Sequence, residues 1–233
     1  MKTLFHELGL RPEITKAIDA LGFEEPSPIQ KQAIPALMSG ADIIAQAPTG
    51  TGKTAAFAIP IMERIDPSKR TVQALVLAPT RELAVQVAEA SHAIGRHCRV
   101  NVLPVYGGQA YDHQLRGLRA GAHLVVGTPG RVMDHIRRGT LNLDAVRFVV
   151  LDEADEMLDM GFIDDIQLIL DQTPPGRQMA LFSATIPPRI QALARRYMKS
   201  PRTIALAHEA KDVPLTHQVY YETPPRGKRD ALR

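Results

Sequence analysis

The sequence predicts an α/β fold in which a mainly parallel β-sheet is covered by helices on both faces. Short, continuously apolar runs alternate with amphipathic helical segments along most of the 233 residues, and such runs are typical of parallel strands buried between two helix layers. A glycine-rich segment links the first apolar run to a helical one, and two carboxylates follow a later run. Ligands of such sheets bind beyond the carboxyl ends of the strands, so these features are expected to meet at one edge.

Seven runs are expected to form the strands. Each is short and rich in β-branched or aliphatic residues, as the interior of a sheet requires. They are Asp42–Gln46, Ala74–Ala78, Asn101–Val105, Leu124–Gly127, Phe148–Asp152, Met179–Ser183 and Thr203–Leu206.

Eight segments have the spacing of apolar residues that favours a helix. Two precede the first strand, and Ser27 and Pro28 suit the N-cap and the first position of the second helix. The helices are Pro12–Leu21, Pro28–Met38, Ala55–Arg64, Glu82–Arg96, Asp112–Ala120, Val132–Arg138, Asp164–Asp171 and Pro188–Met198.

Composition excludes several classes of protein. No apolar run approaches the ~20 residues that span a membrane, and the first residues have no signal-peptide pattern. Cys98 is the single cysteine, so no disulfide framework exists and a reducing cytoplasm is the expected location. The net charge of +3 comes from the last eight residues, which carry four basic side chains and one acid, so that residues 1–225 are neutral. Total charge therefore does not identify a nucleic-acid partner.

The first site feature is a phosphate-binding loop. Its glycines allow backbone N–H groups to approach phosphate, and the helix that follows adds a favourable dipole. Lys53 is expected to reach the β- and γ-phosphates and Thr54 to bind the metal ion. The strict pattern has glycine where this chain has Ala47. The loop reads Ala47-Pro48-Thr49-Gly50-Thr51-Gly52-Lys53-Thr54.

The second site feature is the acidic run that follows Phe148–Leu151. Asp152 is expected to hold Mg²⁺ opposite Thr54, and Glu153 to act as general base toward the attacking water. Together with the loop, this run predicts that the protein binds a nucleoside triphosphate with magnesium and hydrolyses it. The apolar residues after the run are expected to pack in the core; they are Met157, Leu158, Met160 and Phe162.

Several further motifs follow one another along the chain. They are Gly22-Phe23-Glu24-Glu25-Pro26-Ser27-Pro28-Ile29-Gln30 with upstream Phe5, Pro79-Thr80-Arg81-Glu82-Leu83-Ala84, Gly107-Gly108, Thr128-Pro129-Gly130-Arg131 and Ser183-Ala184-Thr185. With these motifs and the acidic run Asp152-Glu153-Ala154-Asp155 in this order, the chain resembles, over about residues 5 to 206, the N-terminal RecA-like domain of DEAD-box RNA helicases. In this family the phosphate loop also begins with alanine.

The resemblance implies a RecA-like P-loop domain over residues 1–206 that uses ATP and Mg²⁺. The amide of Gln30 complements N7 and N6 of adenine, which predicts selection of ATP over GTP, and Phe5 resembles the aromatic residue that stacks on the base. The loop residues Pro48, Thr49, Gly50, Thr51, Gly52, Lys53 and Thr54 are then the nucleotide-binding set.

The resemblance also implies that strand-end turns grip an RNA backbone without sequence preference. Few aromatic residues, 5% with no tryptophan, fit contact through phosphate and sugar rather than base stacking. Taken alone, Thr80 could equally be a helix cap and Gly107-Gly108 a simple turn. The expected RNA-binding residues are Pro79, Thr80, Arg81, Gly108, Thr128, Pro129, Gly130 and Arg131.

Asp155, Ser183 and Thr185 are implied to couple hydrolysis to strand separation, although Ser183 and Thr185 could instead cap a helix. The family has a second, C-terminal RecA-like domain whose arginines complete the ATP site. Residues 207–233 are interpreted as a linker and the start of that domain, with a strand at Gln218–Glu222, and are expected to be disordered or to dock on a neighbouring molecule. Without the second domain, weak ATP binding and very slow hydrolysis are expected.

Two alternative functions stay open at this point. One is a nucleotide-gated RNA clamp that does not unwind duplexes productively. The other is a DNA translocase of the same superfamily, which Gln30 and the spelling of the acidic run disfavour.

Overall fold

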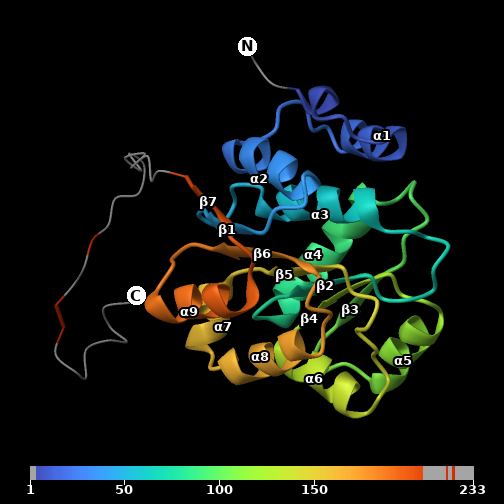
Figure 1. Ribbon diagram of the computed structural model, residues 1–233, viewed down its shortest axis with the longest axis vertical. Helices are drawn as coiled ribbons and strands as arrows, with labels where there is room; N and C mark the ends of the chain where they lie inside the picture. Colours follow the sequence, from blue (N-terminus) through green and yellow to red (C-terminus); the bar gives the residue numbers. More distant parts are fainter. Residues whose placement is uncertain (1–3, 207–218, 220–221, 224–233) are drawn as a thin grey trace.

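The described residues form one seven-stranded parallel sheet with the strand order β3-β4-β2-β5-β6-β1-β7 (Figure 1). The structure is a computed structural model that describes residues 4–206, 219 and 222–223. The strands are β1 Ile43–Gln46, β2 Ala74–Leu77, β3 Val102–Val105, β4 Leu124–Gly127, β5 Phe148–Leu151, β6 Gln178–Ser183 and β7 Arg202–Ala205. All seven predicted strands are confirmed, to within a residue or so at each end.

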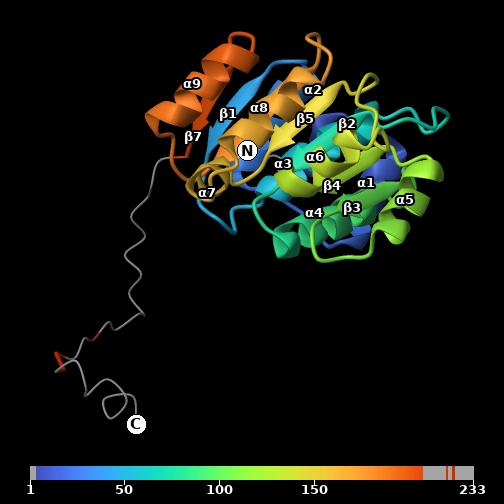
Figure 2. The same cartoon turned by 90° about the horizontal axis from the view of Figure 1, so that it is seen from below.

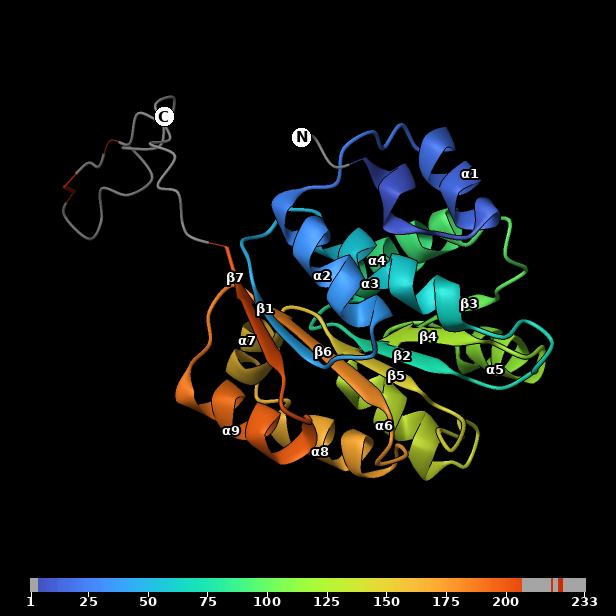
Figure 3. The same ribbon diagram turned by 45° about the horizontal axis from the view of Figure 1, so that its top comes forward.

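Helices cover both faces of the sheet, as the apolar strands require (Figures 2 and 3). The helices α1 to α4 pack with the face that carries Val76 and Val150, and α6 to α9 with the face that carries Leu77 and Leu151. The helices are α1 Pro12–Ala20, α2 Pro28–Met38, α3 Lys53–Arg64, α4 Arg81–Ile94, α5 Tyr111–Arg119, α6 Pro129–Arg137, α7 Ala154–Asp159, α8 Ile163–Asp171 and α9 Pro188–Tyr197, with a 3-10 helix η1 at Phe5–Leu8. The predicted α/β architecture is therefore confirmed.

The register brings the carboxyl ends of the strands to one edge. Gln46 of β1 lies opposite Ser183 of β6, and Leu77 of β2 lies between Leu151 of β5 and Gly127 of β4. Because all these strands run in the same direction, the segments that follow them leave the sheet at the same level. The motifs that follow these strands in the sequence therefore all lie at this edge of the sheet.

Four sequence predictions need correction. The short helices α7 and η1 were not predicted, because each is too brief for a periodic apolar pattern. Helix α6 begins at Pro129 rather than Val132, since Thr128 takes the N-cap position and proline suits the first turn. Met160 is 52% exposed, so its assignment to the core is wrong, whereas Met157 and Leu158 are buried as expected. The exposure of Met160 follows from its place just after the end of α7.

Two expectations concern other parts of the chain. Apart from Val219, Glu222 and Thr223, residues 207–233 lie outside the described residues, and so does most of the strand predicted at Gln218–Glu222. Among the described residues, no helix has the length and apolarity to cross a bilayer.

Candidate functional site

A hollow of about 150 Å³ at the carboxyl edge of the sheet brings together residues from four distant parts of the sequence. The phosphate loop, the segment after β2, helix α7 and the residue after β6 all contribute to its wall. Of the residues predicted from sequence, six line this hollow, and Glu156, Met160 and Ala184 lie beside them. The six are Thr49, Lys53, Pro79, Thr80, Glu153 and Asp155.

The phosphate loop is held by the start of helix α2. The Ser27 hydroxyl donates to the carbonyl oxygen of Thr51 at 2.7 Å, and the Gln30 Nε2 donates to that of Gly52 at 3.0 Å. Gly52 has φ +89°, and a Cβ atom there would lie only 2.5 Å from Gln30 Nε2. The backbone conformation therefore favours glycine at this position, and a larger residue would also displace the Gln30 amide.

Lys53 begins helix α3 and is 6% exposed. Its Nζ donates to the carbonyl oxygen of Ala47, the first residue of the loop, at 3.2 Å. The loop is closed further by Thr51, whose hydroxyl donates to the Pro48 carbonyl at 2.8 Å. The lysine ammonium is thus held inside the curve of the loop, beside the backbone N–H groups that begin α3, which is an arrangement suited to phosphate.

Asp152 is a buried carboxylate next to this lysine, with 2% of its surface exposed. Burial raises the pKa of Asp152 from 3.8 to about 6, and the neighbouring Glu153 adds to the rise. The Lys53 ammonium and the hydrogen bond from the Glu153 N–H to Oδ1, at 3.1 Å, act in the opposite direction. The charged form of Asp152 is therefore kept at a cost that a bound cation would offset.

Glu153 has a left-handed backbone, with φ 51° and ψ 53°, and stands at the N-cap position of α7. A non-glycine residue in this region is strained, and such strain gathers at functional sites. The sharp turn points the chain from the end of β5 into α7 within one residue. It leaves Asp152 buried and places Glu153 on the wall of the hollow.

The acidic run is hydrogen-bonded to the segment after β6. The carboxylate Oδ2 of Asp155 accepts from the backbone N–H and from the hydroxyl of Thr185, both at 2.8 Å. The Ser183 hydroxyl accepts from the Asp155 N–H at 3.2 Å. Burial acts to raise the pKa of Asp155, but these hydrogen bonds outweigh it and lower the pKa. Neither Ser183 nor Thr185 caps helix α9, whose N-cap is Pro187.

Gln30 is 7% exposed, and its amide closes a capping box with Ser27 by accepting from the Ser27 N–H at 2.8 Å. Phe5 is 2% exposed and stacks on Phe23 with 5.9 Å between ring centroids. Phe23 is the more accessible ring of the pair, at 37%. The stacking of Phe5 on a base stays a prediction.

The residues predicted to bind nucleic acid lie in the turns after β2, β3 and β4. Thr80 caps helix α4, with its hydroxyl accepting from the Leu83 N–H at 3.2 Å, and Arg81 is exposed beside Glu82. Gly108 has φ +77°, and a Cβ atom there would lie 3.7 Å from the Arg81 guanidinium. The turns after β2 and β3 are therefore neighbours in space.

Arg131 does not extend into solvent as its predicted contact with RNA suggests. Its side chain is 13% exposed, and its Nη1 donates to the Gln109 carbonyl at 3.1 Å and to the Gln114 Oε1 at 3.3 Å. The predicted residues Thr128, Pro129 and Gly130 form the start of α6 beside it. Sequence reasoning missed Gln114, since a glutamine inside a helix gives no signal of burial.

The donor set fits magnesium. Asp152 and Thr54 offer carboxylate and hydroxyl oxygens, which are ligands that Mg²⁺ prefers. Within the described part of the chain, no cluster of three or more His, Cys, Asp or Glu side chains could hold a metal ion by itself. Mg²⁺ commonly keeps several waters and binds through one or two protein groups together with phosphates, so a sparse protein set is the expected one.

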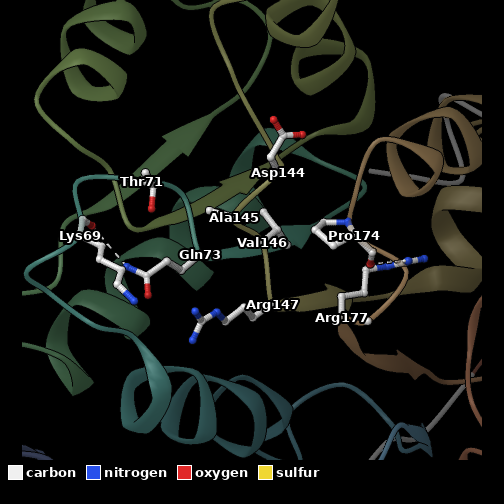
Figure 4. A pocket seen from close by; sticks show the side chains of 10 residues that line it. Lys69, Thr71, Gln73, Asp144, Ala145, Val146, Arg147, Pro174 and Arg177 are labelled. Carbon is white, nitrogen blue, oxygen red and sulfur yellow. Dashed lines mark hydrogen bonds between the residues drawn. The ribbon is translucent and has the colours of Figure 1, made fainter.

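A second hollow, of about 270 Å³, lies at the opposite edge, where β2, β5 and β6 begin (Figure 4). The side chains of Lys69 and Arg147 extend toward the same space, whereas Arg177 points away from it (Figure 4). None of the residues predicted as a site from the sequence lines this hollow.

Known proteins are similar in sequence to nearly the whole chain. The sequence model of the family described as DEAD/DEAH box helicase matches residues 27–193. The DEAD-box ATP-dependent RNA helicase CshA of Geobacillus kaustophilus is 53% identical over 230 residues, which are 99% of this chain and 49% of that protein. The ATP-dependent RNA helicase DeaD of Escherichia coli is 51% identical over 232 residues, or 99% and 37% of the two chains.

A solved structure is similar to this chain in both fold and sequence. The crystal structure of a DEAD box protein from the hyperthermophile Methanococcus jannaschii superposes with a TM-score of 0.84 at 42% identity, covering 100% of this chain and 63% of that one. The chain spans about half of the length, or less, of the curated relatives it matches.

Proposed function

Because the chain belongs to the DEAD/DEAH box helicase family, we propose that it is the nucleotide-binding part of an ATP-dependent RNA helicase. The RecA-like fold expected from the resemblance is confirmed by the superposition on a DEAD box protein. The observation that carries the proposal is the single hollow lined by the phosphate loop, the acidic run, the turn after β2 and the end of β6. The proposed triphosphate site is thereby next to the turns proposed to hold RNA. It is also next to the segment proposed to couple nucleotide hydrolysis to RNA.

Gln30 is proposed to read adenine. Its Nε2 has two hydrogens and uses one on Gly52, and its Oε1 has two lone pairs and uses one on the Ser27 N–H. One donor and one acceptor remain, which is what N7 and N6 of adenine require. Guanine presents an acceptor where adenine donates, and would leave that amide oxygen unpaired. Phe5 is proposed to stack on the base, which requires its ring, 2% exposed and packed on Phe23 in this structure, to become accessible.

Hydrolysis is proposed to use residues of the hollow. Lys53 shifts from the Ala47 carbonyl to the β- and γ-phosphates, and the backbone N–H groups of Thr49 to Thr54 bind their oxygens. Asp152 and Thr54 would hold Mg²⁺, which would neutralise charge on the phosphates. Glu153 orients the attacking water and accepts its proton. The arginines of a second RecA-like domain are proposed to complete the site.

The RNA backbone is proposed to bind across the turns after β2, β3 and β4. Backbone N–H groups and hydroxyls at the starts of α4 and α6 suit consecutive phosphates of one strand, and Arg81 adds an exposed cation. The proposed contact set is Pro79, Thr80, Arg81, Gly108, Thr128, Pro129 and Gly130, and Arg131, whose guanidinium is hydrogen-bonded to Gln109 and Gln114, supports the turn beside them. Contacts of this kind carry no sequence preference.

Asp155, Ser183 and Thr185 are proposed to transmit the state of the nucleotide to RNA. Asp155 follows Glu153 closely, so that a shift of the acidic run during hydrolysis acts directly on its two hydrogen bonds with Thr185. In the complete protein, closure onto the C-terminal domain would convert this movement into local unwinding. We propose that the 233-residue chain alone binds ATP weakly and turns it over very slowly, because arginine fingers contribute about 10³–10⁵ to turnover. A cytoplasmic location stays a prediction.

Equilibrium binding tests the proposal. The chain is titrated with ATP and GTP in the presence of Mg²⁺, and with single-stranded RNA and DNA of the same length at low salt. We expect binding of ATP over GTP, and binding of RNA that Arg81→Ala weakens while Arg147→Ala, which removes an exposed cation at the opposite edge, does not.

Equal binding of the two nucleotides, or RNA binding that depends on Arg147 alone, would overturn the assignment. A preference for DNA would favour a DNA translocase. A full-length protein that binds RNA with ATP but never separates a duplex would favour a nucleotide-gated clamp.

A further inference from the structure

The turn at Gly107-Gly108 is fixed on both sides by one buried side chain. Gln114 of helix α5 has no exposed surface, and its Nε2 donates to the Tyr106 carbonyl at 2.9 Å and to the Gln109 Oε1 at 3.0 Å. Tyr106 immediately precedes the two glycines and Gln109 immediately follows them. The two exposed glycines therefore span a short segment whose ends are both tied to the same amide.

The oxygen of the Gln114 amide is hydrogen-bonded to side chains of helix α6. The Gln114 Oε1 accepts from the His135 Nε2 at 2.9 Å and from the Arg131 Nη1 at 3.3 Å. Arg131 also donates to the Gln109 carbonyl at 3.1 Å. Gln114 thus uses both of its donors and both of its acceptor positions, which is the full capacity of a glutamine amide.

Aromatic packing fixes Arg131 in the same arrangement. Two guanidinium groups lie over the Tyr111 ring, with Arg131 4.8 Å and Arg138 4.4 Å from its centroid. The His135 ring packs against Tyr111 with 4.4 Å between centroids. Such contacts each contribute modestly, but together they leave the Arg131 side chain only 13% exposed.

His135 is neutral in this network at neutral pH. Burial lowers the pKa of His135 and the charge of Arg131 lowers it further, whereas Asp134 opposes the shift and Arg138 adds a lesser lowering effect. With a proton on Nε2 for Gln114, the Nδ1 atom is an acceptor for the Thr140 hydroxyl at 2.9 Å, and the His135 carbonyl is a second acceptor for the same hydroxyl at 3.0 Å. Each polar atom of the glutamine and of the imidazole therefore has a partner.

We propose that Gln114 is a positioning residue for RNA, which sets the Gly107-Gly108 turn and Arg131 in their binding arrangement before RNA arrives. This inference rests on the proposed function. Arg131 then acts mainly through the turn that it holds, because its guanidinium is turned inward. A preset turn avoids the entropy that a flexible glycine pair would lose on binding. In the preset turn, Gly108 is exposed, has φ +77° and lies beside Arg81.

Gln114→Leu tests the proposal, with Gln73→Leu as the matched control. Gln73 is likewise buried, at 5%, and its amide closes a loop at the opposite edge through the Asp66 N–H and the carbonyls of Asp66 and Lys69. Binding of single-stranded oligouridine to the 233-residue chain is followed by backbone amide NMR, which measures weak affinities. Hydrogen exchange at Gly108 and Gln109 is measured without RNA, and the affinity for ADP is measured separately.

We expect Gln114→Leu to weaken RNA binding about tenfold, because Arg131 and His135 lose a buried acceptor, and to speed exchange at Gly108 and Gln109. ADP affinity should stay within about twofold of the wild-type value, since Gln114 lies outside the nucleotide hollow. Gln73→Leu should lower thermal stability to a similar degree and leave RNA affinity unchanged.

Three results would overturn it. Equal RNA affinity of Gln114→Leu and wild type, unchanged exchange at the turn, or an equal loss with Gln73→Leu would each show that Gln114 is only structural. A wild-type chain whose turns show no RNA-induced shifts would instead refute the proposed function, so the two failures are distinguishable.

Discussion

Replacement of Asp152 by asparagine is expected to stabilise the chain when no nucleotide is bound. The carboxylate is 2% exposed, and burial raises its pKa from 3.8 to about 6. At about 1.4 kcal/mol per pH unit, this difference means that the charged form costs about 3 kcal/mol of folding free energy at pH 8. Asparagine keeps the oxygen that accepts from the Glu153 N–H but carries no charge. Asp152→Asn should therefore raise the free energy of unfolding by about that amount.

The pH dependence of stability tests independently whether the charge of Asp152 opposes folding. Because the pKa of Asp152 is higher in the folded state, the folded chain binds more protons than the unfolded chain between pH 3.8 and about 6, and its stability rises as the pH falls through this window. The advantage of Asp152→Asn should shrink from about 3 kcal/mol at pH 8 to about 1.5 kcal/mol at pH 5. Urea unfolding of both proteins at each pH, followed by circular dichroism, measures this difference.

Asp155→Asn is the matched control, because it is expected to change the free energy of unfolding in the opposite direction. Hydrogen bonds from Ser183 and Thr185 outweigh burial and lower the pKa of Asp155, so its charged form stabilises the fold above pH 3.8 and this stability is lost at lower pH. Asp155→Asn should therefore destabilise the chain at pH 7. If the Asp152→Asn and wild-type curves run parallel from pH 5 to pH 8, the charge of Asp152 does not oppose folding and the reasoning fails.

Two further predictions concern the loop and the acidic run. Gly52→Ala should cost about 2–3 kcal/mol and abolish discrimination between ATP and GTP, because a Cβ atom would lie 2.5 Å from Gln30 Nε2 at φ +89°. Gly50 is the control, because it has φ +82° and no atom within 4 Å of its Cβ position. Gly50→Ala should cost about 1–2 kcal/mol of stability and leave the discrimination between ATP and GTP intact. Equal effects of the two substitutions on this discrimination would contradict the steric argument. Thr185→Val removes the hydroxyl that donates to Asp155 at 2.8 Å, so it should raise the pKa of Asp155 and cost about 1 kcal/mol. An unchanged pKa of Asp155 in an NMR titration would exclude this role for the hydroxyl.

The strands and the edge where the motifs meet could be predicted from the sequence. Runs such as Phe148–Leu151 are apolar at every position because both faces of the sheet are covered, and parallel strands bring their carboxyl ends together. The link from Asp155 to Thr185 was expected only from the family resemblance, and the structure shows its hydrogen bonds. Spacing in sequence cannot show such a link, since β5 and β6 must first pair.

The network around Gln114 could not be predicted from the sequence. Its members come from the turn after β3, from α5 and from α6, and apart from Arg131, which was predicted to bind RNA, none is singled out by its own segment. Helix α5 is strongly amphipathic, yet the side chain buried completely is a glutamine, because the glycine turn leaves carbonyl groups that need donors. Polar burial of this kind depends on partners from other elements, so a pattern within one helix does not show it.

The acidic run breaks two local rules within two residues, and each break has a physical use at the proposed site. Asp152 holds a charge where folding alone would favour a neutral group, and Glu153 has a left-handed backbone that folding alone would give to glycine. A cation bound at Asp152 would stabilise its charged form, so that Mg²⁺ at the proposed site would offset this cost. The turn at Glu153 lets adjacent residues face different surroundings, one buried beside Lys53 and the other on the wall of the hollow. The free chain is thus less stable than its sequence could make it, and the residues that lower its stability are those of the proposed nucleotide site.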